Sequence, residues 1–150
     1  MAHYRARFDP IGLYENEVYD SIPALLARLK AAGAVIGVAT SKYHGFASRI
    51  LAHFDLARYV DFVAGSEPDG TRRREDEVIA HALDRLDSGR KQRAVMIGDR
   101  HFDITGAKAL GLPGIGVTWG FGSREERTAA GAAYVVDHVA ELQALLLTAE

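Results

Sequence analysis

Short apolar segments alternate with amphipathic segments along this chain. The apolar segments end at glycine or polar residues, which is typical of strands buried on both faces of a sheet. They cover residues 34–39, 60–64, 94–97, 114–119 and 134–136. Between them, apolar residues recur at intervals of three and four, which predicts helices. These helices are expected at residues 20–33, 44–53, 75–86, 104–111 and 123–131, with a last one from 137 onward.

Local signals support the helix ends. Asp20 or Ser21 is expected to cap the first helix, and Ser123 and Asp137 are expected to cap the last two. Residues 1–18 are expected to be irregular or weakly helical, because proline and glycine interrupt them. Alternating strands and helices predict an α/β fold of three layers, with a doubly wound, Rossmann-like parallel sheet. Because the sequence contains no linker or repeat, residues 1–150 are expected to form a single domain.

Composition narrows the class of protein. The chain has 150 residues and a net charge of -2, which gives no electrostatic reason to expect nucleic-acid or membrane partners. Cysteine is absent, which excludes disulfides, thiolate metal sites and a cysteine nucleophile. There is no apolar stretch long enough for a signal or membrane segment. A soluble, cytoplasmic protein is therefore expected.

Two acids follow the apolar segment 94–97. Asp99 would lie at the carboxyl end of a strand, where open α/β sheets bind ligands, and Asp103 one helical turn later would face the same crevice. Paired carboxylates with room for water and an anion suit Mg²⁺. By spacing alone, the two acids could equally begin a helix, whose positive dipole end favours acidic residues. His101, between them, is either a ligand or a supporting surface residue.

A second group of polar residues follows the first predicted strand. Thr40 and Ser41 precede a helix, so a hydroxyl and free backbone N–H groups could hold a phosphate, with Lys42 adding positive charge. The loop with Arg72, Arg73 and Arg74 would supply further cations. Alternatively, Thr40 is a helix cap and the three arginines form a solvated surface. If these groups share one edge with the two acids, they suit phosphoryl chemistry through Mg²⁺. Residues 119–121 contain Trp119 and Phe121, which would contact substrate or pack in the core or rim.

With these residues in place, the chain resembles the haloacid dehalogenase-like phosphatases, especially their phosphoglycolate phosphatase-like branch. The resemblance runs from about Gly12 to the carboxyl terminus and depends on the order and spacing of several short motifs. These motifs are Val35 to Lys42, Ala64 to Ser66, Asp69 to Arg72, Val95 to Asp99 with Asp103, Gly114 to Val117, and Trp119 to Ser123.

The resemblance implies a Mg²⁺-dependent phosphate-monoester hydrolase that works through an aspartyl-phosphate on a small phosphorylated metabolite. It implies that Thr40 binds the transferring phosphoryl group, beside Ser41 and Lys42, which the strand end already suggests as phosphate-binding residues. It also implies that Asp99 holds the metal with support from Asp103.

Two departures from the family pattern limit this reading. The family's nucleophile lies in an Asp-x-Asp-Gly-Thr motif on the central first strand, upstream of a cap. The sequence contains no such motif, and residues 9–12 only imitate it. The family also places a lysine where this chain has Glu75, for which Arg74 or Arg73 would be the stand-in.

The chain is therefore expected to be a carboxyl-terminal portion that lacks the central first strand and the cap, with residues 1–18 as a cap or linker remnant. It is expected to be inactive on its own. The alternative is a non-catalytic module that binds an anion and Mg²⁺ or a partner. Without the central strand, its neighbours would keep open edges or pair directly, so a homodimer is also expected.

Overall fold

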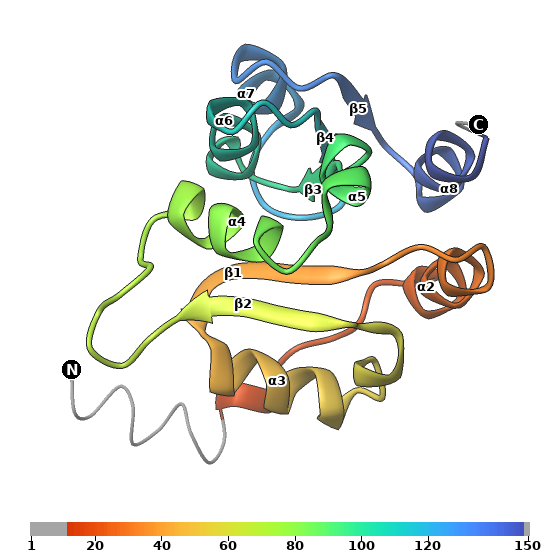
Figure 1. Cartoon of the computed structure of the whole chain (residues 1–150). Helices are drawn as coiled ribbons and strands as arrows, with labels where there is room; N and C mark the ends of the chain where they lie inside the picture. Colours follow the sequence, from red (N-terminus) through yellow and green to blue (C-terminus); the bar gives the residue numbers. More distant parts are fainter. Residues whose placement is uncertain (1–11, 149–150) are drawn as a thin grey trace.

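The computed structural model describes residues 12–148 and confirms an α/β fold whose strands pair in parallel (Figure 1). Of the expected cap or linker remnant at residues 1–18, residues 1–11, which include the motif-like Asp9, lie outside the described residues. Strands β1 (Gly37–Tyr43) and β2 (Phe62–Ser66) form one sheet. Strands β3 (Met96–Gly98), β4 (Gly114–Val117) and β5 (Tyr134–Val136) form another.

The parallel sheet is divided between β1 and β3. Its two parts have the orders β1-β2 and β3-β4-β5, and within residues 12–148 no ladder joins them. In the described part of the chain both β1 and β3 therefore present an open edge, as expected if a shared central strand is missing. Of the two outcomes expected for such neighbours, the structure has the open edges and not direct pairing.

Seven α-helices and two 3-10 turns are described in residues 12–148. The predicted helices are all present, α3 with the predicted ends and the others with shifted ends. The short α5 was not predicted because its sequence, SGRKQ, carries no apolar stripe. None of the described helices is long and apolar enough to span a bilayer. The bounds are η1 Gly12–Tyr14, α2 Ile22–Ala31, α3 His44–His53, η2 Ala57–Tyr59, α4 Glu75–Leu83, α5 Ser88–Gln92, α6 His101–Ala109, α7 Arg124–Ala129 and α8 Val139–Leu147.

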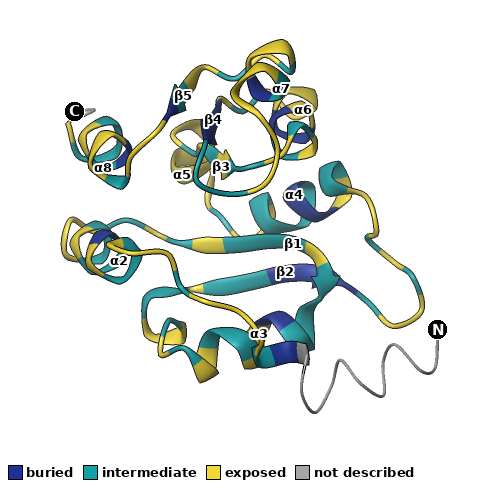
Figure 2. Cartoon of the chain, turned by 180° about the vertical axis from the view of Figure 1, so that it is seen from behind, coloured by how far each residue is buried: buried dark blue, intermediate teal, exposed yellow. Residues whose placement is uncertain are grey.

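Helices cover both sheets and also connect them. α3 and α4 lie on opposite faces of β1–β2, while α6 and α7 pack against the second sheet (Figure 1). α4 contacts both β1 and α6, so it joins the two parts. Buried residues gather on β4 and on the inner faces of the helices (Figure 2). The main apolar cluster joins α2 and α8 to β4 and β5 through Leu25, Ile115, Val117, Val136 and Leu142.

The first strand begins later than predicted because a side chain holds the segment before it. The Asp61 carboxylate accepts a hydrogen bond from the backbone N–H of Ile36 at 2.8 Å and pairs with Lys30, whose ammonium also reaches the Ala34 carbonyl. The Ile36 N–H and the Ala34 carbonyl are therefore bonded to side chains and not to the ladder. The strand instead continues through Thr40 to Tyr43, with an irregular register after Ala39.

Two predicted helix caps are wrong. Ser21 precedes α2 with φ 67° and makes no side-chain capping bond. His138, and not Asp137, is the residue before α8. Asp137 instead accepts hydrogen bonds from the Thr118 hydroxyl and the Arg124 guanidinium. Ser123 does cap α7 as predicted, since its Oγ accepts the N–H of Glu126 at 3.1 Å.

Candidate functional site

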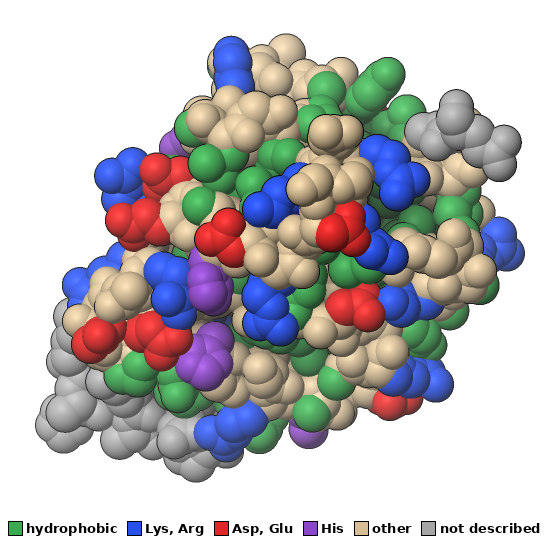
Figure 3. Space-filling model, in the orientation of Figure 1, with side chains coloured by type: hydrophobic (Ala, Val, Ile, Leu, Met, Phe, Trp, Pro, Cys, Tyr) green, Lys and Arg blue, Asp and Glu red, His purple; other side chains and the backbone are tan. Residues whose placement is uncertain are grey.

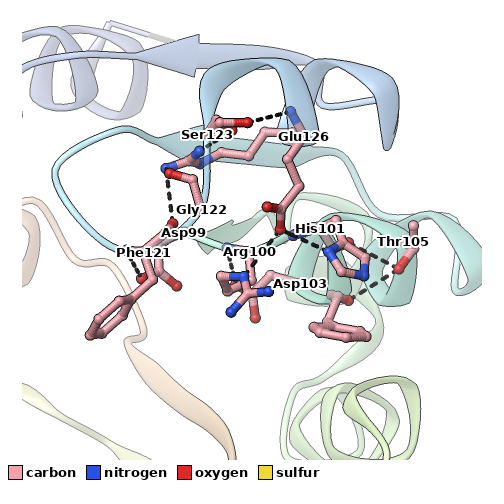
Figure 4. A network of polar contacts seen from close by, with 11 residues as sticks. Asp99, Arg100, His101, Asp103, Thr105, Phe121, Gly122, Ser123 and Glu126 are labelled. Carbon is pink, nitrogen blue, oxygen red and sulfur yellow. Dashed lines mark hydrogen bonds and ion pairs between the residues drawn. The ribbon is translucent and has the colours of Figure 1, made fainter.

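Asp99 and Asp103 lie together where β3 passes into α6. Asp99 directly follows β3, and Asp103 lies in the first turn of α6, where its carboxylate accepts the N–H of Arg100 at 3.0 Å. Asp99 Oδ2 accepts the N–H of Phe121, which comes from the loop after β4, at 2.6 Å (Figure 4). The carboxyl ends of two neighbouring strands therefore meet at the acid pair, as the parallel-sheet pattern predicts.

Two glycines make room for these carboxylates. A Cβ on Gly98 would lie 2.2 Å from Asp103 Oδ2, and a Cβ on Gly120 would lie 2.3 Å from Asp99 Oδ2. Both distances are far shorter than any atomic contact allows, so any other residue at either position would displace an acid. The site is thus a cradle in which the backbone of Gly98 lies against the Asp103 carboxylate and that of Gly120 against the Asp99 carboxylate.

A third carboxyl group borders the pair. Burial raises the pKa of Asp103, and the charge of Asp99 raises it further. Burial also raises the pKa of Glu75, at the start of α4, and its charge repulsion from and hydrogen bond to Asp103 add to this effect. When several carboxylates lie close together and are half-buried, their mutual repulsion favours either protonation of one of them or binding of a cation.

The donor set fits Mg²⁺, which accepts one or two protein carboxylates and completes its shell with water and phosphate oxygens. Each acid has one oxygen tied to a backbone N–H, which orients the side chain. Among residues 12–148 no cluster of three or more histidines, cysteines or acids has a metal-binding arrangement. Asp99 and Asp103 are therefore the candidate ligands in the described part of the chain, and their carboxylates fit this role.

Glu126 on α7 fixes the position of Arg100 and His101, which lie between the two acids. Its Oε1 accepts from the N–H of His101 at 2.9 Å, and the His101 Nδ1 and Arg100 Nε lie 2.7 and 3.1 Å from it (Figure 4). These bonds lower the pKa of Glu126 to about 2. His101 therefore supports the site through Glu126, one of the two roles that the sequence left open.

Glu126→Gln is expected to reduce stability in a pH-dependent way. The folded pKa of about 2 lies below the ordinary glutamate value of about 4.3, so ionised Glu126 contributes stability above about pH 5. That contribution is lost as the pH falls toward 2. Urea unfolding of wild type and variant from pH 7 to pH 2 measures the gap, which should close with acid. The neighbouring exposed Glu125→Gln is the control, and a gap unaffected by pH would contradict the prediction.

Arg127 holds the loop that carries Phe121. Its side chain is fully buried, and its guanidinium donates to the backbone carbonyls of Ser123, Phe121 (3.1 Å) and Gly122 (3.5 Å). Its Nε has no hydrogen-bond partner among the described residues. The N–H of Phe121 is bonded to Asp99 and its carbonyl to Arg127, so the backbone is fixed on both sides.

The residues predicted to bind phosphate lie on the other sheet. Thr40, Ser41 and Lys42 occupy the irregular end of β1, where the Thr40 hydroxyl oxygen accepts the N–H of Lys42 at 3.2 Å. Burial lowers the pKa of Lys42, which lines an apolar cavity together with residues 16–19, Ile22, Ile50, Phe54 and Leu56. The lining of that cavity comes from elements other than α6 and the loop after β4.

The three arginines at positions 72–74 each have different contacts. Arg72 has φ 58°, and its guanidinium bonds the Gly65 carbonyl and Glu67. Arg73 lies over Gly70. Arg74, expected as a stand-in for a catalytic cation, is largely exposed and pairs with Asp76 at 2.6 Å. In this conformation Arg74 is engaged away from the acid pair, while Glu75 faces it.

Sequence reasoning missed Gly120, Glu126 and Arg127 as parts of the site. Their partners lie more than twenty positions away or in the loop backbone, so no local spacing reveals them. The paired glycines around Phe121 were the available signal, because glycine often marks a close backbone approach.

The chain is similar to a protein family and to several known proteins. A family model described as haloacid dehalogenase-like hydrolase matches residues 2–117. The chain is 47% identical over 124 residues to a 5'-nucleotidase of Pseudomonas aeruginosa, covering 83% of the chain and 56% of that protein. It is 39% identical over 144 residues to the tyrosine-protein kinase PtkA of Mycobacterium tuberculosis, covering 95% and 48%.

Two further matches agree with these. A phosphoglycolate phosphatase of Rhodospirillum rubrum is 34% identical over 142 residues, which are 95% of this chain and 58% of that protein. The crystal structure of a predicted phosphatase from Clostridium acetobutylicum superposes with a TM-score of 0.92 at 46% identity, over 98% of this chain and 68% of that one. The chain spans about half the length of the curated relatives that it matches.

Proposed function

Because this chain belongs to the haloacid dehalogenase-like hydrolase family, in its phosphoglycolate phosphatase-like branch, we propose that it carries the Mg²⁺- and phosphate-binding part of a phosphate-monoester hydrolase. The observation that supports this most directly is the acid pair at the end of β3, seated against Gly98 and Gly120. Carboxylates at the carboxyl edge of a parallel sheet suit a metal that neutralises phosphate charge.

Each predicted residue has a definite task in this proposal. Asp99 and Asp103 would hold Mg²⁺, which when bound offsets the negative charge of the phosphate oxygens. The Thr40 oxygen already accepts the N–H of Lys42, so its hydroxyl proton can be donated to a phosphoryl oxygen. The Lys42 and Ser41 side chains would add a cation and a second hydroxyl. Arg74 would serve as a further cation only after it leaves Asp76.

A nucleophile is the missing part of this arrangement. In the family resemblance an aspartate on the central strand forms the aspartyl-phosphate, and the sequence has no Asp-x-Asp-Gly-Thr motif. The open edges of β1 and β3 leave the place of such a strand unpaired, and Val95 and Ile97 on and beside β3 are exposed. We therefore propose that this polypeptide by itself binds Mg²⁺ and phosphate without turning over phosphate esters.

The test measures binding and turnover separately. Calorimetric titration with Mg²⁺ and inorganic phosphate is expected to show binding that Asp99→Asn abolishes, while p-nitrophenyl phosphate is not hydrolysed. Hydrolysis that depends on Mg²⁺ and disappears in Asp99→Asn would contradict the proposed inactivity. Failure of the wild-type chain to bind Mg²⁺ would contradict the proposed site.

A non-catalytic binding module is the second candidate, and Glu75 favours it. A carboxyl group beside Asp103 adds negative charge where a phosphatase of this family has a lysine, so it weakens phosphate binding and strengthens cation binding. Glu75→Lys separates the two candidates. Under the hydrolase proposal it should tighten phosphate binding several-fold, whereas a module that binds only a cation should gain nothing.

For a full-length protein that contains this chain, we propose a small phosphorylated metabolite as the substrate. The names of two relatives, a 5'-nucleotidase and a phosphoglycolate phosphatase, support small phosphate monoesters with different leaving groups. The bound phosphate would be common to both, and groups around the site would choose the rest of the molecule.

A homodimer is also proposed, because the open edges of β1 and β3 can pair with a second copy. The exposed Val95 and Ile97 would then be covered. Light scattering at high concentration is expected to detect a dimer, and a species that remains monomeric would contradict this.

A further inference from the structure

Phe121 is an exposed aromatic side chain beside the acid pair. It is 74% exposed, the highest value among the large hydrophobic residues exposed in the described part of the chain. Figure 4 shows its ring projecting past Asp99, on the side away from Ser123 and Glu126. Exposing a phenyl ring is unfavourable, and covering it with an apolar ligand surface would recover that free energy.

The ring is not on a loose loop. The N–H of Phe121 is bonded to Asp99 at 2.6 Å, and its carbonyl accepts from the buried Arg127 at 3.1 Å. Gly120 lies directly against Asp99, and Gly122 approaches both the Asp99 backbone and Glu126. Because the backbone is already fixed, stacking a ligand on the ring orders only the side chain and not the loop, which makes it an effective contact.

A second exposed ring borders the other acid. Phe102, the residue before Asp103, is 52% exposed, and its ring is tilted against that of His101 at a centroid distance of 3.8 Å. The Arg100 guanidinium lies 5.7 Å from the Phe102 ring. Two exposed aromatic side chains are therefore carried by the segments that hold the acids, Phe121 in the loop bonded to Asp99 and Phe102 in the first turn of α6. Flat aromatic groups are the ligands that such rings bind most favourably.

Building on the phosphate site proposed above, we propose that Phe121 is a specificity-determining residue, which selects phosphate monoesters whose leaving group carries a flat aromatic ring. With the phosphate held near Asp99, the leaving group extends beside the Phe121 ring and stacks on it. Nucleoside monophosphates and aryl phosphates share this chemistry. Phosphates of short aliphatic alcohols lack it and gain nothing from Phe121.

The test compares matched ligands in the presence of Mg²⁺. One pair is 5'-AMP and ribose 5-phosphate, and the other is phosphotyrosine and phosphoserine. Calorimetric titration gives the ratio of dissociation constants within each pair, so each protein variant supplies its own reference. Stacking is expected to make the aromatic member bind about tenfold more tightly in at least one pair. The pair that shows the preference identifies the nucleoside or the aryl source.

Variants then assign the preference to Phe121. Phe121→Ala keeps the backbone N–H on Asp99 and is expected to reduce the ratio to about one, while Phe121→Trp retains it. Tyr134→Ala removes another exposed aromatic, at the opposite end of the second sheet, and should keep the wild-type ratio.

Three outcomes would overturn the proposal, and they are distinguishable. If ribose 5-phosphate and phosphoserine bind but the aromatic members bind no more tightly, the aromatic preference fails and the phosphate site stands. If the preference survives Phe121→Ala, another residue causes it. If none of the four ligands binds with Mg²⁺, the phosphate site fails as well.

Discussion

Gly98→Ala is expected to abolish Mg²⁺ binding and to destabilise the fold. The new Cβ would lie 2.2 Å from Asp103 Oδ2 and 2.3 Å from its Cβ, so either β3 or the first turn of α6 must move. Overpacking of this kind costs about 1–3 kcal/mol. Because Asp103 is half of the proposed ligand pair, the same displacement removes it from Asp99, which makes the effect on binding larger than the effect on stability.

Urea unfolding and Mg²⁺ titration of the same protein preparations measure both effects. Gly89→Ala is the matched control, because its Cβ would meet only Asp87 Oδ1 at 3.5 Å, an ordinary contact. In helix α5 that change should be neutral or stabilising by up to about 1 kcal/mol. If Gly98→Ala binds Mg²⁺ like the wild type, the cradle does not form the metal site.

Arg127→Ala is expected to cost about 3–5 kcal/mol of unfolding free energy, because it empties a fully buried position and removes charged hydrogen bonds. Arg127→Met should cost much less, since it fills the space and also removes a buried charge whose Nε has no partner among the described residues. Both variants release the carbonyls of residues 121–123, so both should loosen the Phe121 backbone.

Two measurements distinguish the role of Arg127 in packing from its role in positioning the Phe121 backbone. Urea unfolding gives the cost of each variant, and hydrogen exchange at the Phe121 amide reports its bond to Asp99. The positioning role requires faster exchange in Arg127→Met even where global stability is retained. Arg124→Met, at an exposed arginine on the same helix, should change stability by less than about 1 kcal/mol. Unchanged Phe121 exchange in Arg127→Met would leave Arg127 with a packing role alone.

The sequence predicted the elements well where hydrophobic period and turn chemistry agree. The β5 segment at 134–136 and helix α3 at 44–53 match the structure, as does the cap of α7 by Ser123. Its errors lie where a distant side chain replaced a local partner. Asp61 holds Ile36 out of the first strand, and Asp137 turns to Thr118 and Arg124. Such contacts depend on packing that no local window contains.

The sequence by itself determined the order of strands and helices, the family resemblance and the position of Asp99 and Asp103 at one strand end. These follow from periodicity and from the rule that parallel strands share a carboxyl edge. Only the tertiary structure decided how the acids are held. Gly98 on β3, Gly120 in the loop after β4, and Glu126 and Arg127 on α7 converge on them, and in the described residues the sheet stays divided between β1 and β3. Close approach and open edges depend on which surfaces meet in space, which local sequence patterns do not specify.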